Sequence, residues 1–314
     1  IEFRKTDPIS SKIQAVIFNL TRKMMMHTDS NALNKKALIE IGFGILLLGT
    51  GPMFVKFAQA NGAVVAFYRL LFAGVMLTLP VVIQSKNEAA SLKDGKRSMW
   101  IVLGGLTLAI NMALWCSALN FTTASVVTLL DNTAPVWIGL FSWLVLGKKQ
   151  KTTYWLGLGM ALSGSALLVG GGILDNQQMM GNVLGIASGI SYAAYLMITQ
   201  QARTSVSSWK YTWLVSTIGA AFLFVYCLAT GAFSETISLT SFILIFLMAL
   251  SSQVFGWYLV NDALGKLPVT GSSVALIGQP VVTTILGVFI LREIPSLFQF
   301  IGGVICVIGI MVVQ

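Results

Sequence analysis

Histidine and charge are scarce in this chain. Of its 314 residues only one is a histidine and 10% are charged, whereas 56% are hydrophobic. Soluble domains carry about 25% charged residues, so this composition predicts an all-α polytopic membrane protein. The single histidine, His27, precedes the first long apolar run. The apolar runs therefore hold no histidine for a proton relay, a His-metal site or a Ser-His dyad.

Cysteine and deep acids are sparse as well. Cys116, Cys227 and Cys306 all lie in apolar runs and are typical of small buried hydrophobic residues. An intramembrane aspartyl protease needs two deep acids, and only Asp131 is deep within a run. The sequence also lacks the GxxxxGK[ST] phosphate loop. We therefore expect no enzyme activity, no cofactor and no metal.

Ten apolar runs are long enough to cross about 30 Å of hydrocarbon. Seventeen of the twenty lysines and arginines fall on one side if the N-terminus is placed inside. This bias predicts cytoplasmic termini and explains the net charge of +9 by the membrane face rather than by nucleic acid. The predicted spans are 37–59, 64–84, 98–118, 122–145, 153–172, 181–201, 209–229, 240–260, 267–291 and 296–313.

The segment before the first span, residues 1–36, is polar and basic. Residues 11–23 place apolar side chains at helical spacing, so they form either a helix on the membrane surface or part of a flexible tail. The chain does not begin with Met, and Met24–Met26 offer a natural start. Residues 1–23 are therefore either native or added upstream sequence.

An internal repeat relates the two halves at an offset of 145 residues. Pro135 aligns with Pro280, and Gly164 with Gly309. Each unit, 37–172 and 181–313, holds five spans, so the second unit enters the membrane from the opposite side. Such inverted repeats are typical of secondary transporters, whose substrates bind near the midplane between the repeats.

Two similar segments carry a family resemblance: LFSWLVLGKKQKTTYWLGLGMALSGSALLV and LGVFILREIPSLFQFIGGVICVIGIMVV. Together with the Pro-centred fourth span of each unit, they resemble the EamA-type drug/metabolite transporter superfamily. The resemblance implies a central cavity walled by spans 1–4 and 6–9, with spans 5 and 10 at the periphery. It also implies export or exchange of small metabolites by alternating access, in the inner membrane of a bacterium. The first copy has Lys148 where the second has Glu293, so that turn has diverged.

The leading candidate residue is Asp131, in the stretch LLDNTAPV. It lies about 13 Å below the outer surface at 1.5 Å per residue. A charge at such depth costs about 2.5–3.5 kcal/mol on insertion scales. The repeat pairs Asp131 with Leu276, so the acid is not shared between the halves. It either binds a proton or a cationic group of the substrate, or is a structural acid paired with a neighbouring helix.

Polar residues beside the two prolines are further candidates. Asn132 either joins the site or bonds backbone groups that Pro135 leaves free. Gln279 is the polar group of the second copy. Pro135 and Pro280 either act as hinges for a rocking motion or only shape the packing.

Two cations and several aromatic residues complete the predicted site. Lys56 and Arg69, near the outer ends of spans one and two, either bind a carboxylate or phosphate or extend to the interface. Glu40 is either interfacial or part of a cytoplasmic gate. The aromatic candidates either line the cavity, where they suit an aromatic group, a base or a cation, or pack between helices. They are Trp115, Tyr192, Tyr195, Trp213, Trp257 and Tyr258.

These residues favour a secondary transporter of an amino acid or its derivative, with Asp131 for the amine and Arg69 or Lys56 for the carboxylate. An alternative substrate is a nucleotide-like or S-adenosyl compound, and an alternative class is a passive channel or a membrane protein without transport activity. The expected partners are a small-molecule substrate, a coupling proton and the lipid bilayer, without nucleic acid. We expect a monomer or a homodimer.

Overall fold

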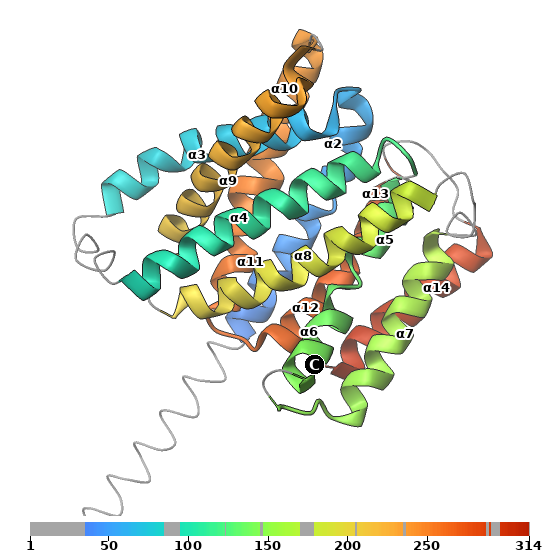
Figure 1. Ribbon diagram of the computed structural model, residues 1–314. Coiled ribbons are helices and arrows are strands. Elements are labelled where there is room, and N and C mark those ends of the chain that lie inside the picture. The colour runs from blue at the N-terminus through green and yellow to red at the C-terminus, as the bar shows by residue number, and fades with distance from the viewer. Residues whose placement is uncertain are drawn as a thin grey trace, which may run out of the picture.

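The computed structural model describes residues 35–84, 95–122, 124–144, 147–169, 179–204, 206–234, 237–286, 289 and 296–313. Within these ranges the chain is helical and has no strand (Figure 1). The predictions for residues 1–34 lie outside the described residues.

Seven of the described helices are long and apolar enough to cross a membrane. Their outward faces carry large apolar side chains, as expected for contact with lipid. The chain is therefore an all-α polytopic membrane protein, as the composition predicts. The seven are Lys35–Val55, Gly62–Ile83, Ser98–Ala118, Met179–Arg203, Ser208–Thr230, Leu239–Leu264 and Val269–Leu286.

Four uninterrupted helices match predicted spans closely. They are α3 (Gly62–Gln84), α4 (Gly95–Ala118), α8 (Met179–Arg203) and α9 (Ser208–Thr230). In the bundle α4 packs along α8 and α3 packs along α9. Helices from the two halves of the chain therefore pack directly against each other.

The predicted span four is broken in its middle. It consists of α5 (Ala124–Asp131) and α6 (Ala134–Leu144). Pro135 has no backbone N–H to bond the carbonyl of Asp131, and Asn132–Thr133 form the turn between the two helices. Asp131 is therefore the last residue of a helix that ends inside the bundle.

The predicted spans nine and one are interrupted too. Span nine comprises α12 (Val269–Ala275), a 3₁₀ turn η7 (Leu276–Gly278) and α13 (Gln279–Leu286), with Pro280 just after the turn. Helix 35–48 ends two residues before α2 (Gly51–Ala58), which carries Pro52 in its first turn. Proline within or next to each break explains why these apolar segments are not single α-helices.

Span eight is longer than predicted. Its helical path runs through α10 (Leu239–Met248), the π-helical segment η6 (Ala249–Gly256) and α11 (Trp257–Leu264). The prediction ended this span at 260, before the polar pair Asn261–Asp262. That boundary is wrong because both side chains have buried or half-buried partners and remain in the helix.

The last helix of each half forms a pair at one side of the bundle (Figure 1). These helices, α7 (Thr152–Val169) and α14 (Leu297–Val313), meet through glycines. A Cβ added to Gly164 would lie 2.3 Å from the backbone nitrogen of Cys306 and 2.5 Å from the carbonyl oxygen of Gly302. The two backbones therefore touch, as small residues allow between membrane helices.

Gly164→Val is expected to destabilise this pair because the backbone of α14 cannot give way to a side chain. Overpacking costs about 1–3 kcal/mol or more. We expect a lower melting temperature of the purified protein in detergent. Gly159→Val is the matched control, because a Cβ at Gly159 on the same helix meets nothing within 4 Å. Equal melting temperatures for the two variants would contradict the close contact.

Candidate functional site

A small polar cavity lies where the interrupted helices meet. It encloses about 40 Å³, room for a few water molecules at roughly 10–15 Å³ of accessible volume each. Six predicted site residues line it: Arg69, Trp115, Asp131, Tyr192, Trp257 and Gln279. The other lining residues are Leu48, Gly51, Pro52, Asn111, Met112 and Thr128. A substrate larger than water would need the surrounding helices to move apart.

Asp131 accepts two hydrogen bonds on one carboxylate oxygen. The amide nitrogen of Asn111 donates to its Oδ1 at 2.8 Å, and the hydroxyl of Ser188 donates to the same atom at 2.5 Å. The Asn111 amide also donates to the Ser188 carbonyl at 3.1 Å. These donors come from α4 and α8, and they stabilise a carboxylate that lipid alone would not tolerate.

Glycines on α8 make this contact possible. A Cβ on Gly189 would lie 2.6 Å from the carbonyl oxygen of Leu130, and one on Gly185 would lie 3.0 Å from the Leu130 side chain. The α8 backbone therefore approaches the end of α5 closely. This approach brings Ser188, one residue before Gly189, within reach of Asp131.

Arg69 supplies a positive charge to the same cavity. Its side chain is 4% exposed, and one terminal nitrogen donates to the hydroxyl of Ser252 at 2.7 Å. Among the described residues, its Nε has no hydrogen-bond partner. The alternative in which Arg69 extends to the membrane interface is therefore wrong, because its guanidinium is buried beside η6.

Aromatic rings form another wall of the cavity. The rings of Tyr192 and Trp257 meet edge to face with centroids 5.8 Å apart, and Tyr195 also meets Trp257 edge to face, at 5.0 Å. The Trp257 Nε1 is buried and has no partner within the described part of the chain, and the buried Tyr192 hydroxyl lies next to the side chain of Gln279. Buried donors without acceptors are costly and are expected to face a ligand or water.

Comparison with known proteins agrees with this architecture. The sequence matches the model of the EamA-like transporter family twice, over residues 37–170 and 179–314. The chain belongs to the EamA-like transporter family. This finding confirms the resemblance to EamA-type drug/metabolite transporters, and it makes the chain a multi-pass membrane transporter.

Relatives of this EamA-type transporter come from archaea and bacteria. A protein of Archaeoglobus fulgidus named as an uncharacterized transporter is 26% identical over 88% of this chain and 97% of its own length. The uncharacterized transporter YwfM of Bacillus subtilis is 23% identical over 85% of this chain and 89% of its own. A solved crystal structure superposes with a TM-score of 0.74 at 18% identity, covering 88% and 97% of the two chains. That structure shares the fold.

The structure does not bring Trp213 to the cavity of this transporter. Trp213 lies on α9 and donates to the hydroxyl of Thr78 at 3.1 Å. Both residues line a groove of about 420 Å³ between α3 and α9, which is larger than the cavity but mostly apolar. None of the described residues that line the groove is charged. The polar cavity, rather than this larger groove, is therefore the candidate site.

Other predicted residues also lie outside the cavity lining. Asn132 is buried, and its amide donates to the carbonyl of Thr128 at 2.8 Å. It thus bonds a backbone group, but not the Asp131 carbonyl that Pro135 leaves free. Pro135 and Pro280 lie at the helix breaks of spans four and nine. The side chain of Lys56 is outside the described part of the structure.

Four polar residues of the site were missed from the sequence: Asn111, Thr128, Ser188 and Ser252. Asn111 is an amide in the middle of the apolar run of span three, and such residues usually mark function. The sequence alone could therefore have identified Asn111 as a candidate. Ser188 and Ser252 resemble the many other serines of the spans, and only the packing reveals their contacts. The described residues contain no group of three acids, cysteines or histidines that could hold a metal.

Proposed function

We propose that this EamA-family protein is a secondary-active transporter, an exporter or exchanger of an amino acid or amino-acid derivative. The observation that carries the proposal is a cavity with opposite charges, Asp131 on one side and Arg69 on another. The acceptors Asp131 and Asn111 suit an ammonium group. The unpartnered N–H of Arg69 and Trp257 and the hydroxyl of Tyr192 suit a carboxylate. A zwitterionic amino acid has both an ammonium and a carboxylate group, so it matches both the acceptors and the donors of the cavity.

The proposed architecture is ten spans in two inverted units, with both termini cytoplasmic. The breaks in spans four and nine support it. Asp131, the last residue of α5, and Leu276, the first residue after α12, are 145 residues apart, which is the offset of the sequence repeat. The packing supports it too. Span two packs on span seven and span five on span ten, so each of these pairs joins the equivalent spans of the two units. Span three packs on span six, and the equivalent contact, between span eight and span one, is present as well. We place the protein in a bacterial inner membrane.

Transport by alternating access follows from this arrangement. The cavity is too small for an amino acid, so a substrate enters only when one set of helices moves. The helix breaks at Pro135 and Pro280 are the proposed hinges. A passive channel would instead let the substrate equilibrate. Accumulation of an amino acid against its gradient in proteoliposomes distinguishes the carrier from the channel.

A second candidate substrate is an S-adenosyl compound. The rings of Trp115, Tyr192 and Trp257 line the same cavity as Asp131. They would stack on a base or hold a sulfonium over their faces. The same carboxylate would pair with the sulfonium or amine.

Thermal stabilisation of the purified protein tests these proposals together. A ligand at 100 times its dissociation constant adds about 2.7 kcal/mol to stability. We expect one or more of the twenty amino acids to raise the melting temperature, and N-acetyl and amide derivatives of the same amino acid to fail. Stabilisation by S-adenosylmethionine alone would favour the second candidate. If amino acids, adenosyl compounds, quaternary amines and sugars all fail, the substrate proposal is wrong.

Trp257→Phe is expected to weaken binding of the stabilising amino acid by about fivefold to tenfold, because it removes one N–H donor worth about 1 kcal/mol. The measurement is a ligand titration followed by melting temperature. Trp213→Phe makes the same chemical change on the groove between α3 and α9 and is expected to leave affinity unchanged. Equal effects of the two substitutions would argue against a role for the Trp257 indole.

A further inference from the structure

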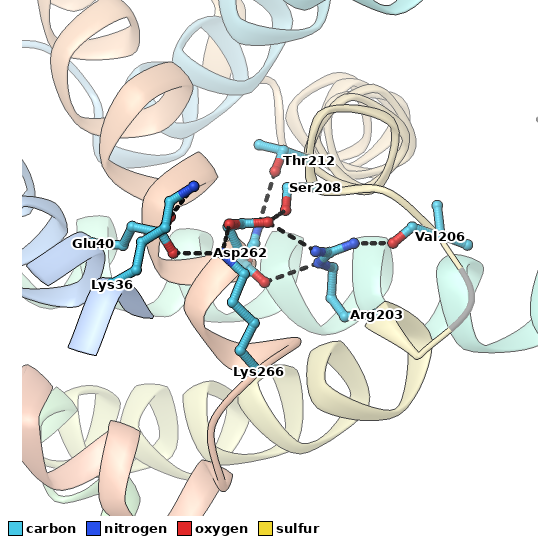
Figure 2. A network of polar contacts seen from close by, with 9 residues as sticks. Lys36, Glu40, Arg203, Val206, Ser208, Thr212, Asp262 and Lys266 are labelled. Carbon is cyan, nitrogen blue, oxygen red and sulfur yellow. Dashed lines mark hydrogen bonds and ion pairs between the residues drawn. The ribbon is translucent and has the colours of Figure 1, made fainter. Parts of the chain in front are cut away.

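A second charged cluster lies at the opposite end of α11 from the cavity (Figure 2). Asp262 is its centre. The guanidinium of Arg203 donates to Asp262 Oδ1 at 3.1 Å, and Ser208 and Lys266 also donate to this carboxylate. Lys266 donates in addition to Glu40 Oε2 at 2.8 Å. We call Glu40, Arg203, Ser208, Asp262 and Lys266 the cytoplasmic cluster, because the Lys and Arg distribution assigns this end to the cytoplasm.

The cluster joins four separate spans. Glu40 lies in helix 35–48, Arg203 ends α8, Ser208 begins α9, and Asp262 and Lys266 lie in and just after α11. Arg203 also donates to the carbonyls of Asn261, at 2.9 Å, and Val206. The connection between α8 and α9 is thereby tied to span eight. These contacts therefore hold four spans together at one end of the bundle.

The cluster is shielded but still reaches water. The side chains of Arg203, Glu40, Asp262 and Lys266 are 8%, 13%, 18% and 26% exposed. Desolvation lowers the pKa of Lys266, but its hydrogen bonds with Asp262 and Glu40 outweigh this and raise it above its ordinary value. The ammonium therefore stays charged in the closed arrangement. When the cluster separates, the same charges can be hydrated at the membrane surface.

Three buried, hydrogen-bonded residues lie between the cytoplasmic cluster and the cavity. Asn261 donates to the hydroxyl of Thr212 at 3.0 Å and accepts from the hydroxyl of Tyr195 at 3.2 Å. All three residues are completely buried. Tyr195 packs in turn against Trp257 of the cavity wall. The described structure is therefore closed between the cavity and this end.

Span eight connects the two sites mechanically. Ser252 in η6 binds Arg69, Trp257 lines the cavity, and Asp262 lies ten residues after Ser252. The distance along the helix is roughly 15 Å at 1.5 Å per residue. π-helical turns within α-helices occur frequently at functional sites. A change at Arg69 that alters the winding of η6 would rotate α11 and displace Asp262.

We propose that the cytoplasmic cluster is the gate that closes the route between the cavity and the cytoplasm and separates once in each transport cycle. The inference rests on the proposed alternating-access function. Ion pairs suit this role because partly hydrated pairs differ little in free energy from separated, hydrated charges. A seal of apolar side chains would expose hydrocarbon on each opening.

Labelling of a cavity thiol tests the gate without a known substrate. Thr128 lines the cavity, so Thr128→Cys in the full chain reports access. Inside-out vesicles expose the cytoplasmic face to a membrane-impermeant methanethiosulfonate reagent. We expect Lys266→Met and Glu40→Gln, each combined with Thr128→Cys, to raise the labelling rate at least tenfold. Lys36→Met is the matched control, because Lys36 is a 70% exposed partner of Glu40 on the same helix. Its labelling rate should stay unchanged.

Unchanged labelling in folded Glu40→Gln and Lys266→Met proteins would overturn the proposal and leave the cluster a static brace. Glu40→Gln removes the ion pair between span one and Lys266 and leaves the other contacts of Lys266 and Asp262 in place. Its pairing with the exposed Lys36 is covered by the Lys36→Met control. Glu40→Gln therefore decides the matter if Lys266→Met does not fold. Because the assay uses no substrate, it stays informative even if no amino acid is transported.

A covalent lock provides the second test. Glu40→Cys with Lys266→Cys, bridged by a short bifunctional thiol reagent, ties span one to span eight. Asp262→Asn is added to these proteins to weaken the gate, so that Thr128→Cys is labelled from the cytoplasmic side. Forming the bridge before the labelling reagent is added should then abolish this labelling. The bridge between Lys36→Cys and Glu40→Cys, one turn apart on a single helix, should leave that labelling fast. Equal labelling with both bridges would contradict a gate at this position.

Discussion

Asp131→Asn is expected to lower the affinity for the amino-acid substrate by at least about 30-fold, because loss of a buried charge partner costs about 2–5 kcal/mol. The fold should survive. An asparagine oxygen at this position can still accept from Asn111 and Ser188, which now donate to Oδ1 of the carboxylate. The measurement is the dissociation constant from ligand-dependent melting, made on a protein that elutes as a single species.

Two further variants separate charge from packing. Ser188→Ala removes one of the two hydrogen bonds to the carboxylate and keeps the charge, so we expect a smaller loss of affinity than for Asp131→Asn. Asn132→Ala changes the neighbouring buried amide, which donates to the backbone of Thr128. It should reduce stability rather than affinity. If Asn132→Ala weakens binding as much as Asp131→Asn, the carboxylate is not the binding group.

We also propose Asp131 as the site of the coupling proton that the sequence predicts. If it carries the coupling proton, Asp131→Asn should abolish accumulation driven by an imposed pH gradient and retain slow downhill exchange. The measurement is uptake into proteoliposomes with and without the gradient. Full proton dependence in the variant would show that another group couples transport to protons.

Arg69→Lys is expected to weaken amino-acid binding by tenfold or more, although the positive charge is kept. Arginine presents several donors in a fixed fork, and Arg69 uses one terminal nitrogen for Ser252 while its Nε remains for the ligand. A lysine ammonium offers no such fork. Because a charged hydrogen bond contributes about 1.5–3 kcal/mol, the predicted loss corresponds to one such bond.

The substrate carboxylate provides the control for Arg69. In the natural protein, replacing the amino acid by its amide should reduce affinity strongly. In Arg69→Met the acid and the amide should bind with similar, weak affinity. A preference for the acid that persists in Arg69→Met would place the carboxylate elsewhere in the cavity. The two measurements together identify the partner of Arg69 even if the variant binds poorly.

The sequence predicted the parts of the site that depend on depth and residue type. A carboxylate, a guanidinium and several aromatic rings within apolar runs are unusual, and Asp131, Arg69, Tyr192 and Trp257 indeed meet in one cavity. The helix breaks could be predicted from Pro135 and Pro280, because proline removes a backbone donor.

The features that the sequence did not predict depend on which neighbouring helix each side chain faces in the folded bundle. Helix α9 has no distinct polar face, so its sequence does not reveal that Trp213 faces the groove with α3 rather than the cavity. Ser188 and Ser252 acquire their roles only through partners on other helices. The predicted span eight ended at 260 and span nine began at 267, which left Asp262 in the connection between them. Its partners from α8 and α9 keep it in the helix.

Exchange of radiolabelled amino acids by proteoliposomes tests the central claim most directly. Vesicles that contain the full chain are loaded with each of the twenty amino acids, and entry of the same labelled amino acid is followed. The account predicts saturable exchange for at least one of them, strongly slowed in both Asp131→Asn and Arg69→Lys and retained in full in Trp213→Phe. Absence of exchange for all twenty, or full exchange by both cavity variants, would contradict a zwitterion site formed by Asp131 and Arg69.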